Sequence, residues 1–306
     1  MVELAIVIVT YQTRELLRKC LDSLRMERDA LSGVWKIIVV DNASTDGTVD
    51  MLKKDFPDVD VIANSDNLGP ARAFNMGIAE AVRVSDLIIV MNSDVIALPG
   101  TIREMISFME ENPDVDGVSC PLFYPDMTPQ KTRTHIMRLL PVKKNRPFRE
   151  DFVGTTFAMI RSRAFHKVGG YDEHYYFYNE DLDWAERARR AGCNFFHLPE
   201  IGVIHALGQG RKQNIPKIIG ELYKSNIYYY KRHYPNLARI ALLALRFEIW
   251  FRIRALRKEL AAASDERRAS EIRSALEVYT RARAKMEEEY IKPCEPEIPE
   301  FAYDGA

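Results

Sequence analysis

Apolar residues in the first hundred positions form two alternating kinds of segment. Continuous β-branched runs such as LAIVIVT at 4–10 are typical of strands buried on both faces. Between these runs, segments such as TRELLRKCLDSLRM place their apolar residues at helical spacing. The strand-like runs are 4–10, 35–44, 59–67 and 86–95, and the helical segments are 13–26, 47–56 and 69–82. The alternation predicts an α/β fold with a doubly wound, mostly parallel sheet flanked by helices.

The pattern is less regular after the fourth strand. Segments 115–125 and 153–165 predict further strands, and 194–208 predicts two short ones. From Ile215 the spacing is helical, and from Ala261 it is typical of a charged helix. We therefore expect an α/β domain at 1–210, a basic and amphipathic helical region at 211–290, and a disordered tail rich in proline and acid at 291–306.

Polar residues gather where the predicted strands end. They are Thr10, Tyr11, Asp41, Asn42, Asp66, Asn67, Asn92 and Asp94. Open α/β sheets bind ligands beyond the carboxyl ends of their strands, so these residues predict a binding crevice at that edge. Asp41 and Asp94 are expected to open onto the same crevice.

Two of these strand ends carry candidate chemistry. In DNASTDGT, Asp41 either belongs to a turn of good turn formers or accepts hydrogen bonds from a nucleobase or ribose edge, and the full octet favours binding. In MNSDV, Asp94 is a hard oxygen ligand suited to Mg²⁺ or Mn²⁺, although it could also cap the following helix.

The stretch NEDLDWAERARRAG at 179–192 crowds three carboxylates ahead of a helical pattern. Acidic residues at a helix start can cap free N–H groups, and a catalytic carboxylate placed there looks identical in sequence. Gly192 predicts the helix end. Asp183 fits a cap, and Arg187, Arg189 and Arg190 are expected on the outer face.

Three other candidates each have a structural alternative. Arg72 either reaches a phosphate or is a solvated surface charge. His205 is either a structural histidine or a metal ligand through its neutral imidazole. Trp184 either stacks on a sugar or belongs to the core.

Bulk properties exclude several classes of protein. The formal net charge of −1 argues against a nucleic-acid partner, and four scattered cysteines predict neither a zinc site nor a disulfide framework. The first strand is followed by TYQTRELL, which lacks the glycines of a dinucleotide site, and the GQG at 208–210 lacks a third glycine. The N-terminus has no basic segment typical of a signal peptide, and no apolar run is long enough to span a bilayer. We expect a cytoplasmic protein.

Taken in order, six stretches resemble family 2 glycosyltransferases, which share the GT-A fold. They are VIVTYQTRELLRKCLDSL, VVDNASTDGT, NLGPARAFNMGI, MNSDV, VGGYDEHYYFYNEDLDWAERARRAG and VIHALG, within residues 4–210. The most similar subgroup contains bacterial rhamnosyltransferases that build surface polysaccharide. The resemblance implies transfer of a sugar from a nucleotide diphosphate donor to a saccharide or lipid-linked saccharide acceptor, with inversion of the anomeric centre.

The resemblance also implies roles for individual residues. Donor contacts fall to Thr10, Tyr11, Asp41, Arg72, Asn92 and Ser93. The resemblance gives metal contacts to Asp94 and His205 and an acceptor contact to Glu180. Trp184 is a further candidate acceptor contact on the stacking alternative alone. Asp181 is the expected general base. The first Asp of the family's DxD-type motif is Asn92 here, which puts metal affinity in doubt.

The helical region adds a second expectation. Between Arg211 and Lys258 there are twelve basic and two acidic residues, with tyrosines interspersed. Such a segment can lie at an anionic membrane surface, or it can pack on the α/β domain or in a homo-oligomer. The sequence leaves these alternatives open.

Two rival functions are weighed against sugar transfer. A nucleotidyltransferase also uses a doubly wound sheet and Mg²⁺, but it needs a glycine-rich basic loop after the first strand. A non-catalytic polysaccharide-binding module does not need Asp94 and Asp181.

Overall fold

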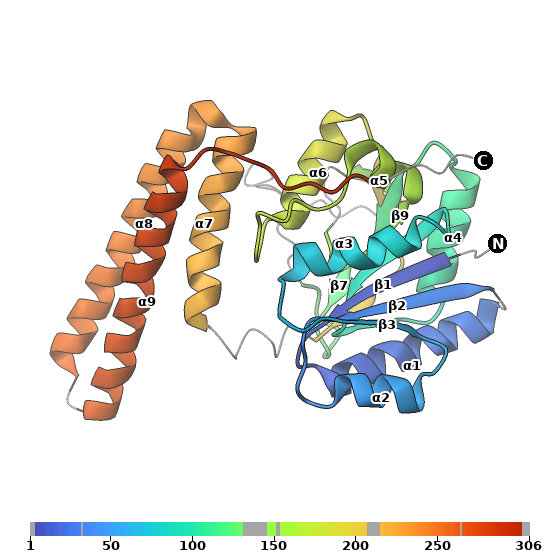
Figure 1. Ribbon diagram of the computed structural model, residues 1–306, viewed down its shortest axis with the longest axis horizontal. Coiled ribbons are helices and arrows are strands. Elements are labelled where there is room, and N and C mark those ends of the chain that lie inside the picture. Colours follow the sequence, from blue (N-terminus) through green and yellow to red (C-terminus); the bar gives the residue numbers. More distant parts are fainter. Residues whose placement is uncertain are drawn as a thin grey trace. The chain divides into compact units, whose positions relative to one another are not determined.

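The computed structural model describes residues 4–31, 33–130, 146–150, 154–206, 215–263 and 265–301. The chain forms two compact units, whose elements are labelled in Figure 1. The α/β unit comprises Met1–Glu173, Asp181–Gly210 and Ile298–Ala306. The helical unit comprises His174–Glu180 and Arg211–Glu297.

The α/β unit alternates strands and helices as predicted. Its strands are β1 (Leu4–Thr10), β2 (Trp35–Asp41), β3 (Asp60–Ala63), β4 (Leu87–Asn92), β5 (Val95–Ala97), β6 (Gly117–Ser119), β7 (Leu122–Phe123), β8 (Phe148–Glu150), β9 (Phe157–Arg161), β10 (Phe195–His197) and β11 (Val203–His205). Its helices are α1 (Arg14–Leu31), α2 (Thr48–Asp55), α3 (Pro70–Ala81), α4 (Thr101–Glu111), α5 (Ser162–Val168) and α6 (Glu180–Arg190). The segment 153–165, predicted as one strand, divides into β9 and α5.

The large sheet has the strand order β3-β2-β1-β4-β9-β6-β10-β8 within the described residues. Strands β3, β2, β1 and β4 are parallel, whereas β9 runs antiparallel between β4 and β6. The chain moves from β1 outward to β3 and returns to β4 on the other side of β1. The carboxyl ends of β1 and β4 therefore flank the point where the strand order reverses, which is where such sheets bind ligands.

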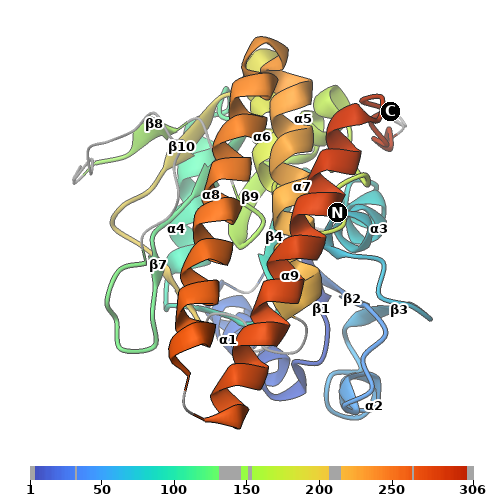
Figure 2. The same cartoon turned by 90° about the vertical axis from the view of Figure 1, so that its left-hand side faces the viewer.

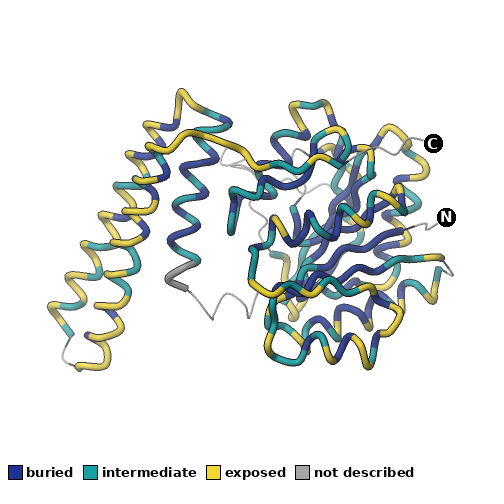
Figure 3. The backbone as a smooth tube through the Cα atoms, viewed as in Figure 1, coloured by how far each residue is buried: buried dark blue, intermediate teal, exposed yellow. Residues whose placement is uncertain are grey.

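Helices cover both faces of this sheet, and its central strands are buried (Figures 1 and 3). Leu4, Ile6 and Ile8 of β1 face one core with α1, α2 and α4. Ala5 and Val7 face the other core, formed with α3, α5 and α6. Alternate residues of one strand thus fill two cores, which explains why β1 reads as a continuous apolar run.

A glycine sets the close approach of α3 to the sheet. A Cβ atom at Gly77 would lie 2.3 Å from Cγ1 of Val7, a distance that packed side chains do not tolerate. The helix therefore rests on β1 only because position 77 has no side chain.

A small sheet of order β5-β11-β7 carries His205. His205 is opposite Val95 in the antiparallel pair of β11 with β5, and Val95 follows Asp94 directly. This pairing brings the end of the fourth strand and the predicted metal-binding histidine together.

The helical unit consists mainly of α7 (Ile215–His233), α8 (Pro235–Ala262) and α9 (Glu266–Ile291), which lie side by side (Figure 2). Their shared core contains Tyr223, Ile227, Leu242, Ile249 and Met286. No helix in the described part of the chain is long and apolar enough to cross a bilayer.

The end of the described chain has contacts within the α/β unit. Helix α9 ends at Ile291, and the Pro299 carbonyl accepts from the Gly170 N–H at 2.8 Å. Phe301 contacts Phe165 edge to face. The aromatic ring of Phe301 gives this acidic segment an apolar contact within the α/β unit. Residues 302–306 lie outside the described part.

Candidate functional site

Three strand ends lie in a row at the carboxyl edge of the sheet. Thr10 at the end of β1 is in register with Asp41 of β2, and Asn92 at the end of β4 is in register with Val9. Because parallel strands end on one side, the polar residues predicted from separate segments meet here. The stretch after β1 also joins this row, through Thr13.

Hydroxyl groups connect the ends of β1 and β4. The Thr13 Oγ1 is 2.8 Å from the Thr10 Oγ1 and 2.8 Å from the Ser93 Oγ. The loops after β1 and β2 are also joined, since the Gln12 N–H donates to the Ser44 Oγ at 2.8 Å. Gln12 has φ 56°, a left-handed conformation that is costly for residues other than glycine and is common at functional turns. Sequence reasoning did not single out Thr13 or Gln12.

The Asp41 carboxylate is buried, and one of its two oxygens accepts no hydrogen bond from the described residues. Its side chain is about 1% exposed, and Oδ2 accepts from the Ser44 N–H at 2.9 Å. Oδ1 has no hydrogen-bond partner among the described residues. A buried carboxylate oxygen without a donor is costly, so this atom is suited to an N–H or O–H of a ligand.

Two other residues expected to contact the nucleotide-sugar donor are more exposed than Asp41. Tyr11 follows β1 and is about 37% exposed at the surface of this edge. Arg72 in α3 forms an ion pair with Glu173 at 3.2 Å and remains largely exposed. Arg72 is therefore paired to a carboxylate in this structure, and reaching a phosphate requires it to leave Glu173.

Asp94 and His205 form the candidate metal site. The His205 Nε2 is 3.4 Å from the Asp94 Oδ1. On the other side of the ring, Nδ1 is 3.1 Å from the Gln130 Oε1, and the Gln130 Nε2 donates to the His205 carbonyl at 2.7 Å. The amide is oriented by the hydrogen bond that its Nε2 donates, so Oε1 accepts from Nδ1–H and the other ring nitrogen, Nε2, faces Asp94.

An imidazole nitrogen and a carboxylate oxygen thus lie 3.4 Å apart, and both are ligand types that divalent cations accept. No group of three or more histidine, cysteine or acidic side chains suited to a metal occurs among the residues that the structure describes. A divalent ion held here needs oxygen ligands from elsewhere, such as substrate phosphates, as is usual for Mg²⁺. The residues fit a metal that binds together with a diphosphate. Gln130 is a positioning residue that the sequence did not reveal.

Asp181 lies at the same edge. Its carboxylate accepts hydrogen bonds from the backbone N–H of Thr155 and of Leu182, the latter at 2.8 Å. Thr156, next to Thr155, accepts from the Asn92 N–H at 3.1 Å. The turn before β9 therefore places Asp181 beside the end of β4. Burial raises the pKa of Asp181, because the ionised carboxylate is desolvated there.

The backbone turns sharply before α6. Tyr178 and Asn179 both have φ 67°, and two consecutive left-handed residues are unusual for side chains of this size. Asn179 donates a 3.0 Å hydrogen bond to Asn226, and both residues belong to the helical unit. The helix then begins at Glu180, which is buried. Such strain is found where the chain must present particular groups.

Three predictions around α6 are wrong. Trp184 has no exposed surface; its Nε1–H donates to the Gly169 carbonyl at 2.9 Å, and its ring packs against Phe165. It belongs to the core and cannot stack on an acceptor sugar. Asp183 is not a cap but a fully buried partner of Arg187, at 2.7 Å. Arg187 therefore lies inside the protein, where it also donates to two backbone carbonyls.

A further polar cluster occurs at the same edge and was not predicted. The Ser119 Oγ is 2.6 Å from the Glu150 Oε2 and 2.8 Å from the His197 Nδ1. These residues end β6, β8 and β10. Each is the last residue of a very short strand, so periodicity alone could not indicate that they meet.

The arrangement of strands and helices in this chain is similar to that of known enzymes. Solved structures with the same arrangement include a mannosyltransferase from Pyrobaculum calidifontis in complex with GDP-Man and Mn²⁺, with TM-score 0.56, 15% identity and coverage of 94% of this chain and 87% of that one. S. aureus TarS 1-349 has TM-score 0.54, 17% identity and coverage of 94% and 89%. The fold is that of GT-A glycosyltransferases.

The sequence places the chain within that class. The family model for glycosyl transferase family 2 matches residues 5–169, and the chain belongs to this family. An N-acetylglucosaminyl-diphospho-decaprenol L-rhamnosyltransferase of Mycobacterium tuberculosis is 29% identical over 239 residues, covering 66% of this chain and 75% of that protein. A dTDP-rhamnosyl transferase, RfbF, of Shigella flexneri is 25% identical over 186 residues, covering 56% and 60%. The resemblance inferred from the motifs is confirmed.

Proposed function

We propose that this chain is an inverting glycosyltransferase that moves a sugar from a nucleotide diphosphate donor to a hydroxyl of a saccharide or lipid-linked saccharide. Rhamnose from dTDP-rhamnose is the favoured donor, because relatives named as rhamnosyltransferases match this chain. Family membership favours sugar transfer over nucleotidyl transfer. Carboxylates at both Asp94 and Asp181 favour catalysis over non-catalytic binding. The proposed setting is polysaccharide synthesis from the cytoplasm.

The observation that carries this proposal is the carboxylate of Asp181 beside the end of β4. In a single displacement the acceptor oxygen forms a bond to the anomeric carbon as the bond from that carbon to the diphosphate breaks. The hydroxyl proton passes to the Asp181 carboxylate, which its raised pKa makes a stronger base. The hydrogen bond from Thr155 fixes the carboxylate, and Glu180 is the proposed acceptor contact.

The donor binds at the neighbouring strand ends. The free Oδ1 of Asp41 accepts from the nucleobase or ribose, with Thr10 and Tyr11 completing the nucleoside contacts. Asn92 and Ser93 lie next to the diphosphate position.

Asp94 and His205 are the residues that would hold Mg²⁺ or Mn²⁺ together with that diphosphate. A divalent cation bound there offsets the charge that develops on the leaving group, an effect of several kcal/mol. Arg72 approaches the donor once it leaves Glu173. The α/β region at 1–210 is thus the proposed catalytic domain.

A thermal-shift screen of nucleotide sugars with and without Mn²⁺ tests the proposal. A donor at 100 times its Kd stabilises the folded protein by about 2.7 kcal/mol. We expect dTDP-rhamnose to raise the melting temperature only when the metal is present. If no nucleotide sugar stabilises the protein with either metal, the proposed function is wrong.

A further inference from the structure

Helix α8 exposes a row of large apolar side chains on one face. They are Leu237, Ile240, Leu243, Phe247, Trp250 and Phe251, each between 47% and 66% exposed. Their spacing of three and four residues places them along one side of the helix. The opposite side, with Leu242 and Ile249, packs in the core of the helical unit. In Figure 3 most residues of α8 are coloured as exposed.

Contiguous apolar patches of this kind mark interaction surfaces, because isolated soluble proteins seldom expose them. We name the six side chains the α8 stripe. Phe247 and Trp250 stack on each other with ring centroids 5.8 Å apart, and the guanidinium of Arg254 lies 5.4 Å from the Trp250 ring. Aromatic rings with adjacent cations are typical of residues at a membrane interface.

The charges of α8 indicate what covers the stripe. The helix has six basic and two acidic residues, whereas α9 has six of each. Both acidic residues of α8 are already paired, Glu248 with Arg252 and Glu259 with Arg268.

Of the six basic residues, four have no carboxylate partner in the described part of the chain. These are Arg239, Arg254, Arg257 and Lys258. At helical spacing they lie on or beside the stripe. The exposed face is therefore apolar along its centre and has uncompensated positive charge beside it.

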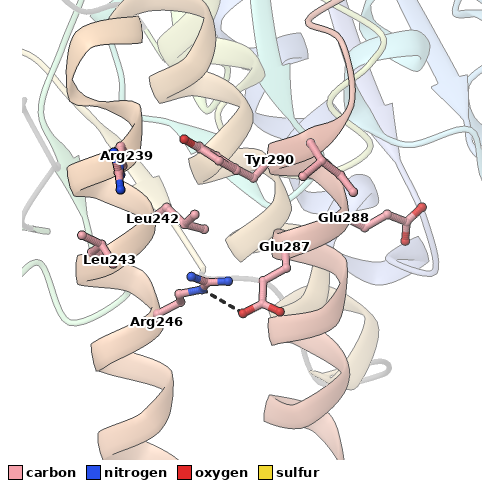
Figure 4. A pocket seen from close by; sticks show the side chains of 8 residues that line it. Arg239, Leu242, Leu243, Arg246, Glu287, Glu288 and Tyr290 are labelled. Atoms are coloured by element: carbon pink, nitrogen blue, oxygen red, sulfur yellow. Dashed lines mark hydrogen bonds and ion pairs between the residues drawn. The ribbon is translucent and has the colours of Figure 1, made fainter.

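The groove between α8 and α9 offers a different kind of surface. It has a volume of about 530 Å³ and contains Arg239 and Arg246 together with Glu287 and Glu288 (Figure 4). The Arg246–Glu287 ion pair at 2.8 Å neutralises part of its charge. Leu243 of the stripe and Arg239 also line this groove, but its mixed charge gives the groove no preference for an anion, whereas the rest of the stripe has only unpaired cations beside it.

We propose that the α8 stripe lies in the interface of a membrane that contains anionic lipid, parallel to its plane. Apolar side chains enter the headgroup boundary, and the four unpaired cations meet lipid phosphates. A two-fold contact between two copies through this face would instead bring eight like charges into one interface, with both carboxylates of each α8 already used. The inference does not depend on the proposed function, because it concerns the helical unit alone.

Vesicle flotation of the full chain tests it, with vesicles of phosphatidylcholine alone or mixed with phosphatidylglycerol. We expect wild type to float with the anionic vesicles, and increasing salt to weaken this binding. Phe247→Gln/Phe251→Gln should lower the vesicle affinity by about tenfold or more. The matched control, Met26→Gln/Val34→Gln, removes two equally exposed apolar side chains from the α/β unit and should bind as wild type does.

A second pair of variants separates the charge from the apolar contribution. Arg254→Gln/Lys258→Gln should weaken binding to anionic vesicles by about tenfold and reduce its salt dependence. The fluorescence of Trp250 should shift to the blue with vesicles, and Trp250→Phe should abolish that shift. If wild type does not float, or the Phe247/Phe251 variant floats equally well, the membrane proposal is wrong. A dimer in light scattering that this variant dissociates, without vesicle binding, would show that the stripe joins two copies.

Discussion

Replacing Asp181 with asparagine distinguishes a role as general base from a role as helix cap. The amide retains an oxygen that can accept from the Leu182 and Thr155 N–H groups, so local geometry is preserved. What is lost is the capacity to take the acceptor proton. General base catalysis typically contributes a factor of about 10² to 10⁴, so kcat should fall by that amount while donor affinity changes little.

The stability of the variant provides an independent check. Burial raises the folded-state pKa of Asp181 above its unfolded value near 3.9. The contribution of this group to stability is therefore complete below the unfolded pKa and is lost as pH rises through the folded pKa. At a pH above the folded-state pKa the ionised carboxylate is a net cost to the folded state, so Asp181→Asn should not lower the melting temperature there.

The assay is sugar transfer measured against pH, beside thermal melts. For wild type, kcat should rise with pH through the raised pKa of Asp181 and then level off, and the variant should lack this step. Asp183→Asn is the structural comparison, because its buried pairing with Arg187 predicts a lower melting temperature with an unchanged shape of the pH profile. An Asp181→Asn protein that melts normally and transfers at near wild-type rate would refute the assignment, and Glu180→Gln would be tested next.

Further predictions concern the donor site and the core. Asp94→Ala should abolish the Mn²⁺ dependence of nucleotide diphosphate affinity, and unchanged calorimetry would contradict the metal assignment. Asp41→Asn should weaken nucleotide binding by about tenfold to a hundredfold, because a charge-assisted hydrogen bond of about 1.5–3 kcal/mol is lost; equal affinity would remove Asp41 from the site. Arg187→Met leaves the Asp183 carboxylate buried without its partner and should cost about 3–5 kcal/mol in chemical denaturation, whereas a cost below about 1 kcal/mol would contradict the pairing.

The positions of Thr10, Asp41 and Asn92 could be predicted because the first four strands have strong patterns. Parallel strands end at one edge, so the strand pattern alone brings their terminal residues together. The family resemblance then assigned their roles.

Other parts of the site depend on contacts that no sequence pattern reveals. Gln130 orients His205 from a residue 75 positions away, and Thr155 reaches Asp181 through a turn before an antiparallel strand. Trp184 and Asp183 lie on a helix whose inner face could not be located from its polar composition. Both side chains are fully buried, which makes them structural. Their burial depends on the elements that pack against the helix, which the local sequence does not specify.

The measurement that tests the central claim most directly is nucleotide release from dTDP-rhamnose by the full chain, with Mn²⁺, with Mg²⁺ and with a chelator, alongside Asp94→Ala and Asp181→Asn. We predict release of dTDP that needs the divalent ion and increases with a saccharide acceptor, and that falls by about a hundredfold or more in Asp181→Asn. Release that is equal in both variants and in wild type, or that is undetectable for every nucleotide sugar tried with either metal, would contradict the account.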